Sequence, residues 1–524
     1  MVYVSPFYSL KAVVASEHPI ASAVGASVLR GGGSAVDAAA ATAFVLSVVL
    51  PHLGGLGGDF FALVRDPDGN ISFINGSGPA PKHLSRDLMV ELGYSFMPEH
   101  GPLTISIPGF VDGIYTLWRK FGSVEWSELL EPAIRLAREG FPTSESLSDT
   151  LLTLRDQLSS DYGSRMTYYP MGESPKVGDI LRFKGIARAI ELIKEDPRSF
   201  YEGDVAKKIV SYVKSLGGVI ELSDLKDYRA EISDPIRASY RGCVIYEMPP
   251  NTQGITTLHI LKILEDVSLH KLCSLSSRRL ATFLAAAKVA YKVRDVYVTD
   301  PRYMKVSTDQ LLSDSFIDEL RVRFREVLTS RKSEKDGGGA LGRSGGGDTT
   351  FFAIADGEGW LVAGIQSLFY PFGSYVTEPT YGITLNSRAS SFSLSKDHIN
   401  CLEPGKKTMH TLSAMIIERG NDVLALGLSG GHFRPLLHAE ILTNMVDYFM
   451  RPQEAIEHPR FVWHLWSDLV DVEEGYIFEG IEGYIFRKVR YPSRLGVAAA
   501  AGIRGKLRAG FTDMRGDGLP IGLV

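Results

Sequence analysis

Residues 35–50, AVDAAAATAFVLSVVL, form a stretch that is apolar almost all round and carries one charged residue, Asp37. A helix without a polar face has to be buried on every side. The stretch is too short to cross a bilayer, which takes about 20 apolar residues. Ser34 and Asp37 have the spacing of a helix-capping pair, and Gly31 to Gly33 separate this helix from a preceding one. We therefore predict a core helix of a soluble, layered protein.

The rest of the chain alternates long helical patterns with strand pairs. "TTFFAIA", a turn at "DGEG" and "WLVAGIQS" predict a hairpin over 349–367. "DVLALGLSGG" predicts a strand that runs into two glycines at 430 and 431, and the helical pattern 432–450 follows it. We find no internal repeat. Long helices mixed with hairpins predict layers of α and β structure with an antiparallel component.

Composition excludes several classes of function. Net charge is −5, with a pI of about 6.2, so we expect neither nucleic acid nor a membrane surface as a partner. The three cysteines are scattered, and neither His-Glu-x-x-His nor Cys-x-x-Cys occurs, so we predict no metal site and no cofactor. The start of the chain does not resemble a signal peptide. These features favour a cytoplasmic protein.

A glycine-rich segment lies directly upstream of the predicted hairpin. Seven of the eleven residues from 337 to 347 are glycine, and Asp348, Thr349 and Thr350 follow them. The segment lacks the lysine of a phosphate-binding loop. A flexible linker before a strand is one interpretation. The other interpretation is a segment that adopts a strained geometry for self-cleavage and leaves the site after the cut.

Threonine chemistry makes the second interpretation worth testing. A threonine hydroxyl is a weak nucleophile unless a base lies beside it, and an N-terminal threonine carries its own base, the free α-amine. The pKa of such an amine is about 7.7–8.0, which suits proton transfer at neutral pH. Inside a chain the same nitrogen is an amide. A nucleophilic Thr349 therefore requires a cut after Asp348.

A rival site lies at "GLSGG", residues 427–431, which has the Gly-x-Ser-x-Gly pattern between a predicted strand and helix. A serine hydrolase would use Ser429 there, with His458 or His464 downstream. The alternative is a tight strand–helix turn whose N–H groups face an anion.

Many segments, in one order along nearly the whole chain, resemble the γ-glutamyltranspeptidase family of N-terminal-nucleophile hydrolases. "NSRASSF", together with "GDT", "IQS" and "PPNTQG", resembles a branch that includes oxamate amidohydrolase. After Trp463 the resemblance is weak. The segments that carry it are the opening through residue 64, 106–142, 201–210, 224–254, 347–359, 427–431 and 512–518.

The resemblance implies an α+β fold, a four-layer αββα sandwich, in which a precursor cuts itself between Asp348 and Thr349. Residues 1–348 would form the large subunit, with the glycine-rich linker 337–347 at its end, and 349–524 the small subunit. Ser367 falls where the family places a hydroxyl that supports the nucleophile. Gly430 and Gly431 fall at its oxyanion-binding glycines, which leaves Ser429 without a role.

Substrate-binding positions depart from the family pattern. An arginine–glutamate pair that holds the substrate's α-carboxylate is replaced by Ser77 and Gly78. The acid that holds its α-amine is replaced by Ser391, and a nearby glutamine by Arg388. The remaining substitutions are an asparagine replaced by Phe369 and paired serines replaced by His410 and Thr411.

Arg388 is either a carboxylate-binding residue or part of a structural ion pair. Losing charged contacts argues for a substrate other than the usual γ-glutamyl compound.

The sequence thus predicts a self-cleaving amide hydrolase with Thr349 as nucleophile, acting on a γ-glutamyl or small amide-carboxylate substrate. Three alternatives stay open: a genuine γ-glutamyltransferase or glutathione hydrolase, a serine hydrolase at Ser429, and an uncleaved, non-catalytic binding protein. The expected partners are a small-molecule substrate and the two subunits of one precursor. Whether the processed pair forms a homo-oligomer is left open.

Overall fold

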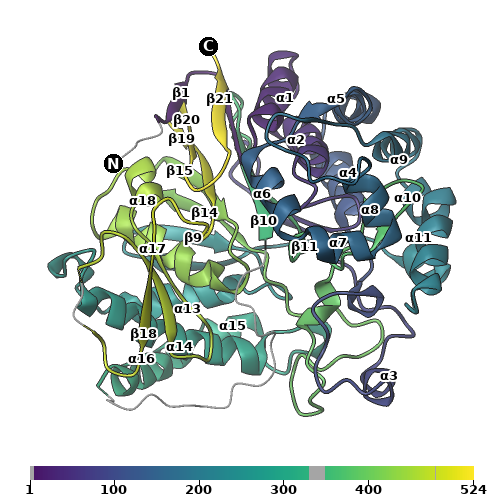
Figure 1. Ribbon diagram of the computed structural model, residues 1–524. Coiled ribbons are helices and arrows are strands. Elements are labelled where there is room, and N and C mark those ends of the chain that lie inside the picture. Colours follow the sequence, from purple (N-terminus) through teal and green to yellow (C-terminus); the bar gives the residue numbers. More distant parts are fainter. Residues whose placement is uncertain (1–4, 330–347, 478–479) are drawn as a thin grey trace.

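Two seven-stranded antiparallel sheets lie face to face, with helices on both outer sides (Figure 1). The computed structural model describes residues 5–329, 348–477 and 480–524; the glycine-rich segment 337–347 lies outside the described residues. The order of the first sheet is β1 (Phe7–Ser9), β20 (Leu507–Thr512), β19 (Ala498–Arg504), β15 (Asp422–Leu428), β14 (Ala414–Arg419), β9 (Cys243–Glu247) and β8 (Ile236–Tyr240). The order of the second sheet is β21 (Leu519–Leu523), β2 (Ala12–Ser16), β10 (Asp348–Ala355), β11 (Leu361–Phe369), β3 (Asp59–Arg65), β4 (Ile71–Gly76) and β7 (Glu231–Ser233).

One helical layer covers each sheet. The layer on the second sheet includes α1 (Pro19–Arg30), α2 (Ala35–Val49), α4 (Phe110–Phe121), α5 (Trp126–Glu139), α9 (Lys184–Glu195) and α11 (Asp204–Ser215). The layer on the first sheet includes α13 (Gly254–Leu264), α14 (Ser277–Tyr297), α16 (Asp314–Thr329), α17 (Arg434–Val446) and α18 (Pro452–Glu457). Figure 1 shows the two layers on opposite sides of the molecule. The predicted αββα sandwich is confirmed.

Smaller elements connect and extend these layers. Short helices are α3 (Arg86–Glu91), α6 (Glu145–Thr153), α7 (Arg155–Ser160), α8 (Tyr162–Tyr168), α10 (Ser199–Glu202), α12 (Leu222–Asp227) and α15 (Thr308–Leu311). A three-stranded sheet is formed by β16 (Phe461–Trp463), β17 (Leu469–Glu473) and β18 (Ile485–Val489), and two strand pairs by β5 (Phe141–Pro142) with β6 (Ile180–Leu181) and β12 (Thr377–Glu378) with β13 (Ile383–Thr384).

The alternation of side chains along β10 explains why it lies in the centre of the sandwich. Phe351 and Ala353 face the first sheet, whereas Phe352 and Ile354 face the helical layer that contains α2. Successive side chains of a strand point to opposite faces, so a strand buried on both faces has to be apolar at every position. The run FFAIA meets that requirement, which fixes β10 inside the second sheet.

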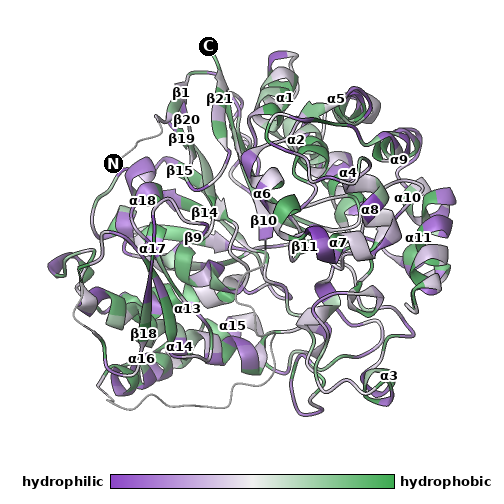
Figure 2. Cartoon of the chain, viewed as in Figure 1, coloured by the Kyte–Doolittle hydropathy of each residue, from purple (hydrophilic) through white to green (hydrophobic). Residues whose placement is uncertain are grey.

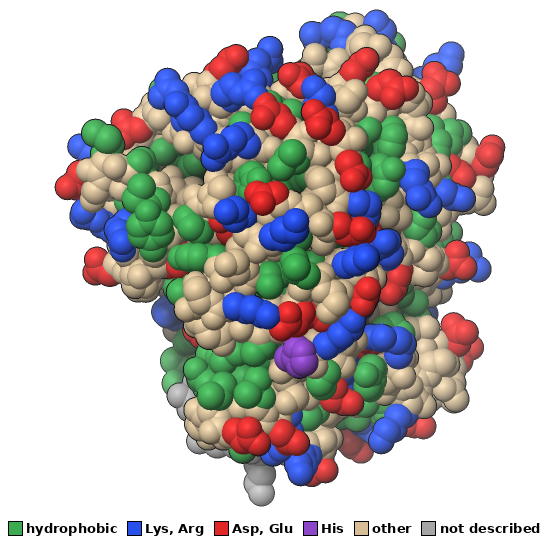
Figure 3. All heavy atoms as spheres, turned by 90° about the vertical axis from the view of Figure 1, so that its right-hand side faces the viewer, with side chains coloured by type: hydrophobic (Ala, Val, Ile, Leu, Met, Phe, Trp, Pro, Cys, Tyr) green, Lys and Arg blue, Asp and Glu red, His purple; other side chains and the backbone are tan. Residues whose placement is uncertain are grey.

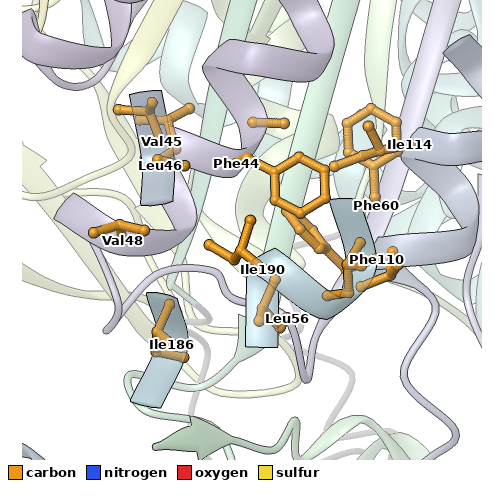
Figure 4. Packing of buried hydrophobic residues seen from close by; sticks show 14 of the residues in the cluster. Phe44, Val45, Leu46, Val48, Leu56, Phe60, Phe110, Ile114, Ile186 and Ile190 are labelled. Carbon is orange, nitrogen blue, oxygen red and sulfur yellow. The ribbon is translucent and has the colours of Figure 1, made fainter. Parts of the chain in front are cut away.

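The apolar helix α2 is buried along its whole length, as its sequence predicts. The Ser34 and Asp37 capping box is present. Phe44 packs edge-to-face on Phe110, with ring centroids 5.4 Å apart, and Phe110 packs on Phe60 of β3 (Figure 4). Each such buried ring contributes about 1.5–3 kcal/mol. This packing holds the second sheet against its helices.

Charged and hydrophobic side chains share the surface of the molecule, as on the face in Figure 3. Green, hydrophobic residues line the strands and the inner faces of the helices in Figure 2, and basic and acidic side chains are interspersed on the face in Figure 3. Of the helices in the described part of the chain, none combines the length and the hydropathy that a membrane crossing requires.

Both sheets contain strands from before and from after residue 348. In the second sheet β10 pairs with β2 on one side and with β11 on the other, and β11 then pairs with β3. A cut before Thr349 would therefore leave both pieces held by the same hydrogen-bond ladders. The division into subunits 1–348 and 349–524 stays a prediction.

Candidate active site

Thr349 lies at the start of β10, next to the end of β11. Its side chain is buried, and its Oγ1 donates a hydrogen bond of 3.4 Å to the hydroxyl of Ser367. The Ser367 hydroxyl in turn donates to the carbonyl oxygen of Asp348 at 2.8 Å. The two hydroxyls thus lie around the Asp348–Thr349 peptide bond. The register of β10 against β11 shifts between Asp348 and Thr350, so this bond lies at an irregularity of the ladder.

Phe369, the last residue of β11, has a strained backbone. Its φ is +86°, a conformation that bulky residues rarely adopt and that clusters at functional sites. In this conformation the Phe369 N–H donates a hydrogen bond of 2.8 Å to the hydroxyl oxygen of Ser367. The Ser367 oxygen therefore accepts two hydrogen bonds and donates one, which fixes the direction of its proton towards Asp348.

Gly430 and Gly431 follow β15 directly. Their φ values are +132° and +52°, which glycine adopts without strain. Within the described residues neither N–H donates a hydrogen bond, so both are available to an oxyanion. The Gln253 amide holds the loop by donating to the carbonyl oxygens of Gly431 and Thr411, both at 2.8 Å.

Arg388, Asp59 and His410 form a fully buried charged cluster. The Asp59 carboxylate accepts from Arg388 Nε at 3.1 Å and contacts His410 Nε2 at 3.0 Å. Arg388 Nη1 also donates to the Thr411 hydroxyl at 3.1 Å, and its guanidinium lies 4.4 Å from the centroid of the Phe369 ring. Arg388 is thus part of a structural ion pair. Its Nη2 has no partner in the described part of the chain.

His410 is neutral in this cluster. Its Nδ1 accepts from the Leu412 N–H at 3.1 Å, which assigns the proton to Nε2, facing Asp59. Burial and the neighbouring Arg388 charge lower the pKa of His410 to about 3, although Asp59 opposes the shift. In this tautomer the Nε2–H of His410 donates to the same Asp59 carboxylate that accepts from Arg388.

A second buried arginine approaches the same residues. Arg434, at the start of α17, donates through Nε to the Leu428 carbonyl at 2.7 Å and through Nη1 to the Thr411 carbonyl. Burial and the charge of Arg388 lower its pKa to about 9. Its Nη2 is also without a partner among the described residues. Two guanidinium groups therefore meet at Thr411.

Ser391, the remaining predicted substrate-binding residue, lies in the short helical turn Arg388–Ser391. Its hydroxyl is buried and unpaired within the residues that the structure describes. A buried hydroxyl without a partner has donor and acceptor capacity to spare.

Ser429 has the wrong partners for a nucleophile elbow. Its Oγ accepts from the Val497 N–H at 2.7 Å. His464 contacts Asp471 at 2.9 Å instead, and no hydrogen bond joins Ser429 to a histidine in the described ranges. A serine nucleophile needs a base within about 2.6–3.2 Å, so the geometry favours Thr349.

A small cavity of about 40 Å³ lies beside the Asp348–Thr349 bond, on the side of β2. Thr349, Asp348 and Ser429 line it together with two residues that the sequence analysis did not single out, Glu17 and His52. Burial raises the pKa of Glu17 well above its usual value and lowers the pKa of His52 to about 3.

Asp59 was also missed, although one sequence signal could have identified it. It is an acid between a glycine cluster and an apolar strand, in GGLGGDFF, where burial requires a charged partner. His52 and Glu17 have no such signal, because an isolated histidine beside an apolar helix is usually a core residue. In the described ranges no three His, Cys, Asp or Glu side chains lie close enough to hold a metal ion.

Comparison with known proteins identifies the lineage. The family model described as γ-glutamyltranspeptidase matches residues 21–523. The chain belongs to the γ-glutamyltranspeptidase family. The match extends through the region after Trp463, where the sequence resemblance is weak. The Bacillus subtilis glutathione hydrolase-like YwrD proenzyme is 35% identical over 530 residues, covering 98% of each chain.

Two further relatives show the breadth of the γ-glutamyltranspeptidase family. The oxamate amidohydrolase proenzyme of Klebsiella pneumoniae is 30% identical, with 89% of this chain and 88% of that protein covered. The crystal structure of cephalosporin acylase from Bacillus halodurans superposes with a TM-score of 0.90 at 31% identity, over 100% of this chain and 98% of the other. This member of the γ-glutamyltranspeptidase family is accordingly an enzyme of the hydrolase and acylase type, and the Bacillus subtilis and Klebsiella pneumoniae relatives are named as proenzymes.

The structure also explains the departure at Ser77 and Gly78. The Ser77 hydroxyl is buried and donates to Asn75 at 2.7 Å. A Cβ atom at Gly78 would lie 1.8 Å from the Ile107 carbonyl oxygen, so no side chain fits there. This γ-glutamyltranspeptidase-family chain therefore has no charged side chain at these two positions, and the buried arginines that donate to Thr411 are Arg388 and Arg434.

Proposed function

We propose that the chain cleaves itself between Asp348 and Thr349, and that the freed Thr349 is the nucleophile of an amide hydrolase. The observation that carries the proposal is the hydrogen-bond chain from Thr349 through Ser367 to the Asp348 carbonyl oxygen. It supports the proposal, because it brings a threonine hydroxyl and a hydrogen-bond donor to the carbonyl oxygen of one peptide bond. The names of the relatives, which include the word proenzyme, agree with a processed precursor.

Self-cleavage follows from this geometry in two steps. Thr349 Oγ1 attacks the Asp348 carbonyl carbon while the Ser367 hydroxyl stabilises the developing oxyanion. The C–N bond then breaks, the nitrogen gains a proton, and an ester joins Asp348 to Thr349. Water hydrolyses this ester, which releases the Asp348 carboxylate and leaves Thr349 with a free amine and a free hydroxyl.

In the mature enzyme the α-amine of Thr349 acts as the base for its own hydroxyl. The hydroxyl attacks the substrate amide carbonyl, and the N–H groups of Gly430 and Gly431 stabilise the oxyanion. The amine half of the substrate leaves with the proton that the Thr349 α-amine took up. Water then hydrolyses the Thr349 ester of the acyl half. This chemistry needs no cofactor.

The substrate in this proposal is a small amide whose acyl group carries a carboxylate. Arg388 and Arg434 each keep one buried Nη2 without a partner, and Asp59 compensates only one of the two charges by direct pairing. A substrate carboxylate would satisfy both groups. The relatives named as glutathione hydrolases favour a γ-glutamyl compound as a second candidate. We further propose that the enzyme is cytoplasmic and acts as a large and a small subunit.

The deciding experiment is a denaturing gel of the purified protein with N-terminal sequencing of the smaller band. Scaling 57.4 kDa by residue number gives roughly 19 kDa for residues 349–524 and roughly 38 kDa for the remainder. A small band that begins Thr-Thr-Phe-Phe supports the proposal. A single intact band after prolonged incubation contradicts it and leaves the non-catalytic alternative.

Two variants then separate the nucleophiles. Thr349→Ala should abolish both cleavage and amide hydrolysis, whereas Ser429→Ala should leave both within about two-fold, because its hydroxyl only accepts a backbone hydrogen bond. Loss of activity in a cleaved Ser429→Ala protein would overturn the assignment. Oxamate, a γ-glutamyl anilide and an uncharged acyl anilide, compared by kcat/KM, test the requirement for a carboxylate.

A further inference from the structure

His432, the residue after the two oxyanion glycines, has no role in the mechanism proposed above. It follows Gly430 and Gly431 in the turn before α17 and is only 5% exposed. Its imidazole packs edge-to-face on the ring of Phe369, with centroids 6.2 Å apart. Phe369 pairs with Asp348 across the β10–β11 ladder, so His432 lies next to the strand end that faces the proposed cleavage site. A carbonyl oxygen held by the two glycines therefore brings its acyl group close to this side chain.

One guanidinium group fixes the position of the proton on His432. Nη1 of Arg294, in α14, lies 3.3 Å from His432 Nδ1. A guanidinium only donates, so Nδ1 accepts and the proton of the neutral ring is on Nε2. The same Nη1 donates to the side-chain oxygen of Gln253 at 3.0 Å, and the Gln253 amide donates to the Gly431 carbonyl oxygen. Arg294 thus orients the imidazole together with the oxyanion loop.

The Nε2–H group of His432 is an available donor. Within the described residues it has no hydrogen-bond partner. The unpaired atoms that are closed off from solvent in this part of the chain include both nitrogens of His52, but not Nε2 of His432. Because the two nitrogens of an imidazole point in diverging directions, the Nε2–H group points away from Arg294 and α14. A ligand on that side can accept its hydrogen bond.

Positive charge around His432 favours an anion in this position and keeps the ring neutral. Burial and the charges of Arg294, Arg388 and Arg434 lower the pKa of His432 well below its usual value. Two of these arginines have a carboxylate partner, Asp295 for Arg294 at 2.8 Å and Asp59 for Arg388 at 3.1 Å. Arg434 has no carboxylate within ion-pair distance in the described ranges. His432 is therefore suited to donating a hydrogen bond to an anion and not to accepting a proton.

We propose that His432 selects the substrate by donating a hydrogen bond from Nε2 to the carboxylate of the substrate's acyl group. The inference rests on the amide hydrolysis proposed above and adds a residue to its recognition of a carboxylate. A neutral donor binds the anion without bringing a further charge into a buried site, where an unpaired charge is costly. The imidazole neither gains nor loses a proton during the reaction.

Two variants of His432 separate hydrogen bonding from packing. His432→Gln retains an N–H donor at the end of the side chain, whereas His432→Leu fills a similar volume without one. In the leucine variant kcat/KM for a carboxylate-bearing amide should fall by about 10-fold to 100-fold, mainly through KM, because one hydrogen bond to a charged group is lost. The glutamine variant should stay within about three-fold. For an uncharged acyl anilide both variants should match the unmodified enzyme.

The pH profile tests whether the ring transfers protons. His432→Gln should keep the pH dependence of kcat/KM around neutral pH, because the neutral ring does not titrate there. Loss of a limb of the profile would assign a proton-transfer role and overturn the inference. His259→Gln is the matched control, since His259 is another buried histidine, in α13, whose Nε2 lies 2.8 Å from the Leu311 carbonyl oxygen. Its kinetic constants should be unchanged.

Calorimetry measures carboxylate binding independently of turnover. Oxalate and L-glutamate are the acyl products of the two candidate substrate classes. The one that binds the purified protein should bind His432→Leu at least about ten-fold more weakly and His432→Gln within about three-fold. Equal affinity in all three proteins, equal losses in both variants, or no binding of either acid would overturn the inference.

Folding and self-cleavage are checked separately. If His432→Leu does not fold, which circular dichroism would show, His432→Asn replaces it, because the asparagine amide is too short to reach the position of Nε2. The asparagine variant should then show the loss expected for leucine. A single intact band for the unmodified chain would instead refute self-cleavage, since carboxylate binding has its own measurement.

Discussion

Two polar clusters flank Thr349, and they differ in how their charges are satisfied. On the side of β3, Asp59 contacts both Arg388 and His410 within 3.1 Å, and all three side chains are fully buried. On the side of β2, the cavity leaves both nitrogens of His52 unpaired. A paired cluster resists rearrangement, because breaking it exposes an uncompensated charge. The Asp59 cluster is therefore held together by ion pairing, whereas the His52 ring is held by packing.

Removal of the Asp59 charge should have the largest effect. Asp59→Asn keeps the volume but leaves Arg388 buried without its counter-ion, so we expect the free energy of unfolding to fall by about 3–5 kcal/mol. The measurement is urea denaturation of the Thr349→Ala precursor with and without Asp59→Asn, which gives the difference in the free energy of unfolding. Asp68→Asn, at an exposed turn position, is the control and should change stability by less than about 0.5 kcal/mol. A loss below about 1 kcal/mol in Asp59→Asn would mean that the cluster does not depend on this ion pair.

Ser367 lies next to Asp59 across the β11–β3 ladder, and its hydroxyl donates to the carbonyl oxygen of the Asp348–Thr349 peptide bond. Ser367→Ala removes the donor to the Asp348 carbonyl oxygen, so self-cleavage should slow by about 100-fold to 1,000-fold, as when one oxyanion donor is removed. Ser367→Thr retains the hydroxyl and should cleave within about ten-fold of the unmodified chain. The rate of precursor loss on a gel is the measurement. Equal rates for the alanine and threonine variants would show that the hydroxyl does not act on this carbonyl.

Acid should destabilise the protein through both clusters. Burial lowers the pKa of His410 and of His52 to about 3, whereas an unfolded histidine has a pKa of about 6.5. Below pH 6.5 the unfolded chain thus binds protons that the folded chain does not. The stability is fully present above pH 6.5 and is lost as the pH falls, by about 1.4 kcal/mol per pH unit for each histidine.

Denaturation in urea between pH 7 and pH 5 measures this slope. His52→Gln and His410→Gln should each flatten it, and a pH-independent stability in the unmodified chain would contradict the prediction. Because both folded-state pKa values are about 3, the two variants should flatten the slope by similar amounts.

Arg388→Lys should have the smallest of these effects, confined to substrate recognition. Lysine keeps the positive charge beside Asp59. It loses the planar guanidinium, of which Nη1 donates to the Thr411 hydroxyl and Nη2 is the unpaired donor proposed to bind substrate. We expect kcat/KM for a carboxylate-bearing amide to fall by about 10-fold to 100-fold, mainly through KM. Self-cleavage should proceed normally, which a gel verifies. An unchanged KM would assign Arg388 to the structural ion pair alone.

Local patterns predicted much of the fold. The run AVDAAAATAFVLSVVL predicts its own burial, because a helix without a polar face has no other stable environment. The turn DGEG predicts the β10–β11 hairpin, and the alternation in TTFFAIA predicts a strand. These features depend on neighbours in the sequence, so a single chain is enough to read them.

The candidate site was only partly predictable. Thr349, Ser367, Gly430 and Gly431 were identified through the resemblance to a family, and the structure brings the first two together. The role of Arg388 could not be decided, because its partner Asp59 lies 329 positions away in the sequence. His52 gave no signal at all.

By itself the sequence indicated the layers of this protein and a candidate nucleophile, Thr349, that would be usable only after a cut. Tertiary structure decided which charges are paired and which are left beside a cavity. The physical reason is that burial and hydrogen bonding set the ionisation of His410, His52 and Arg434, and both depend on residues that only the assembled sheets bring into contact.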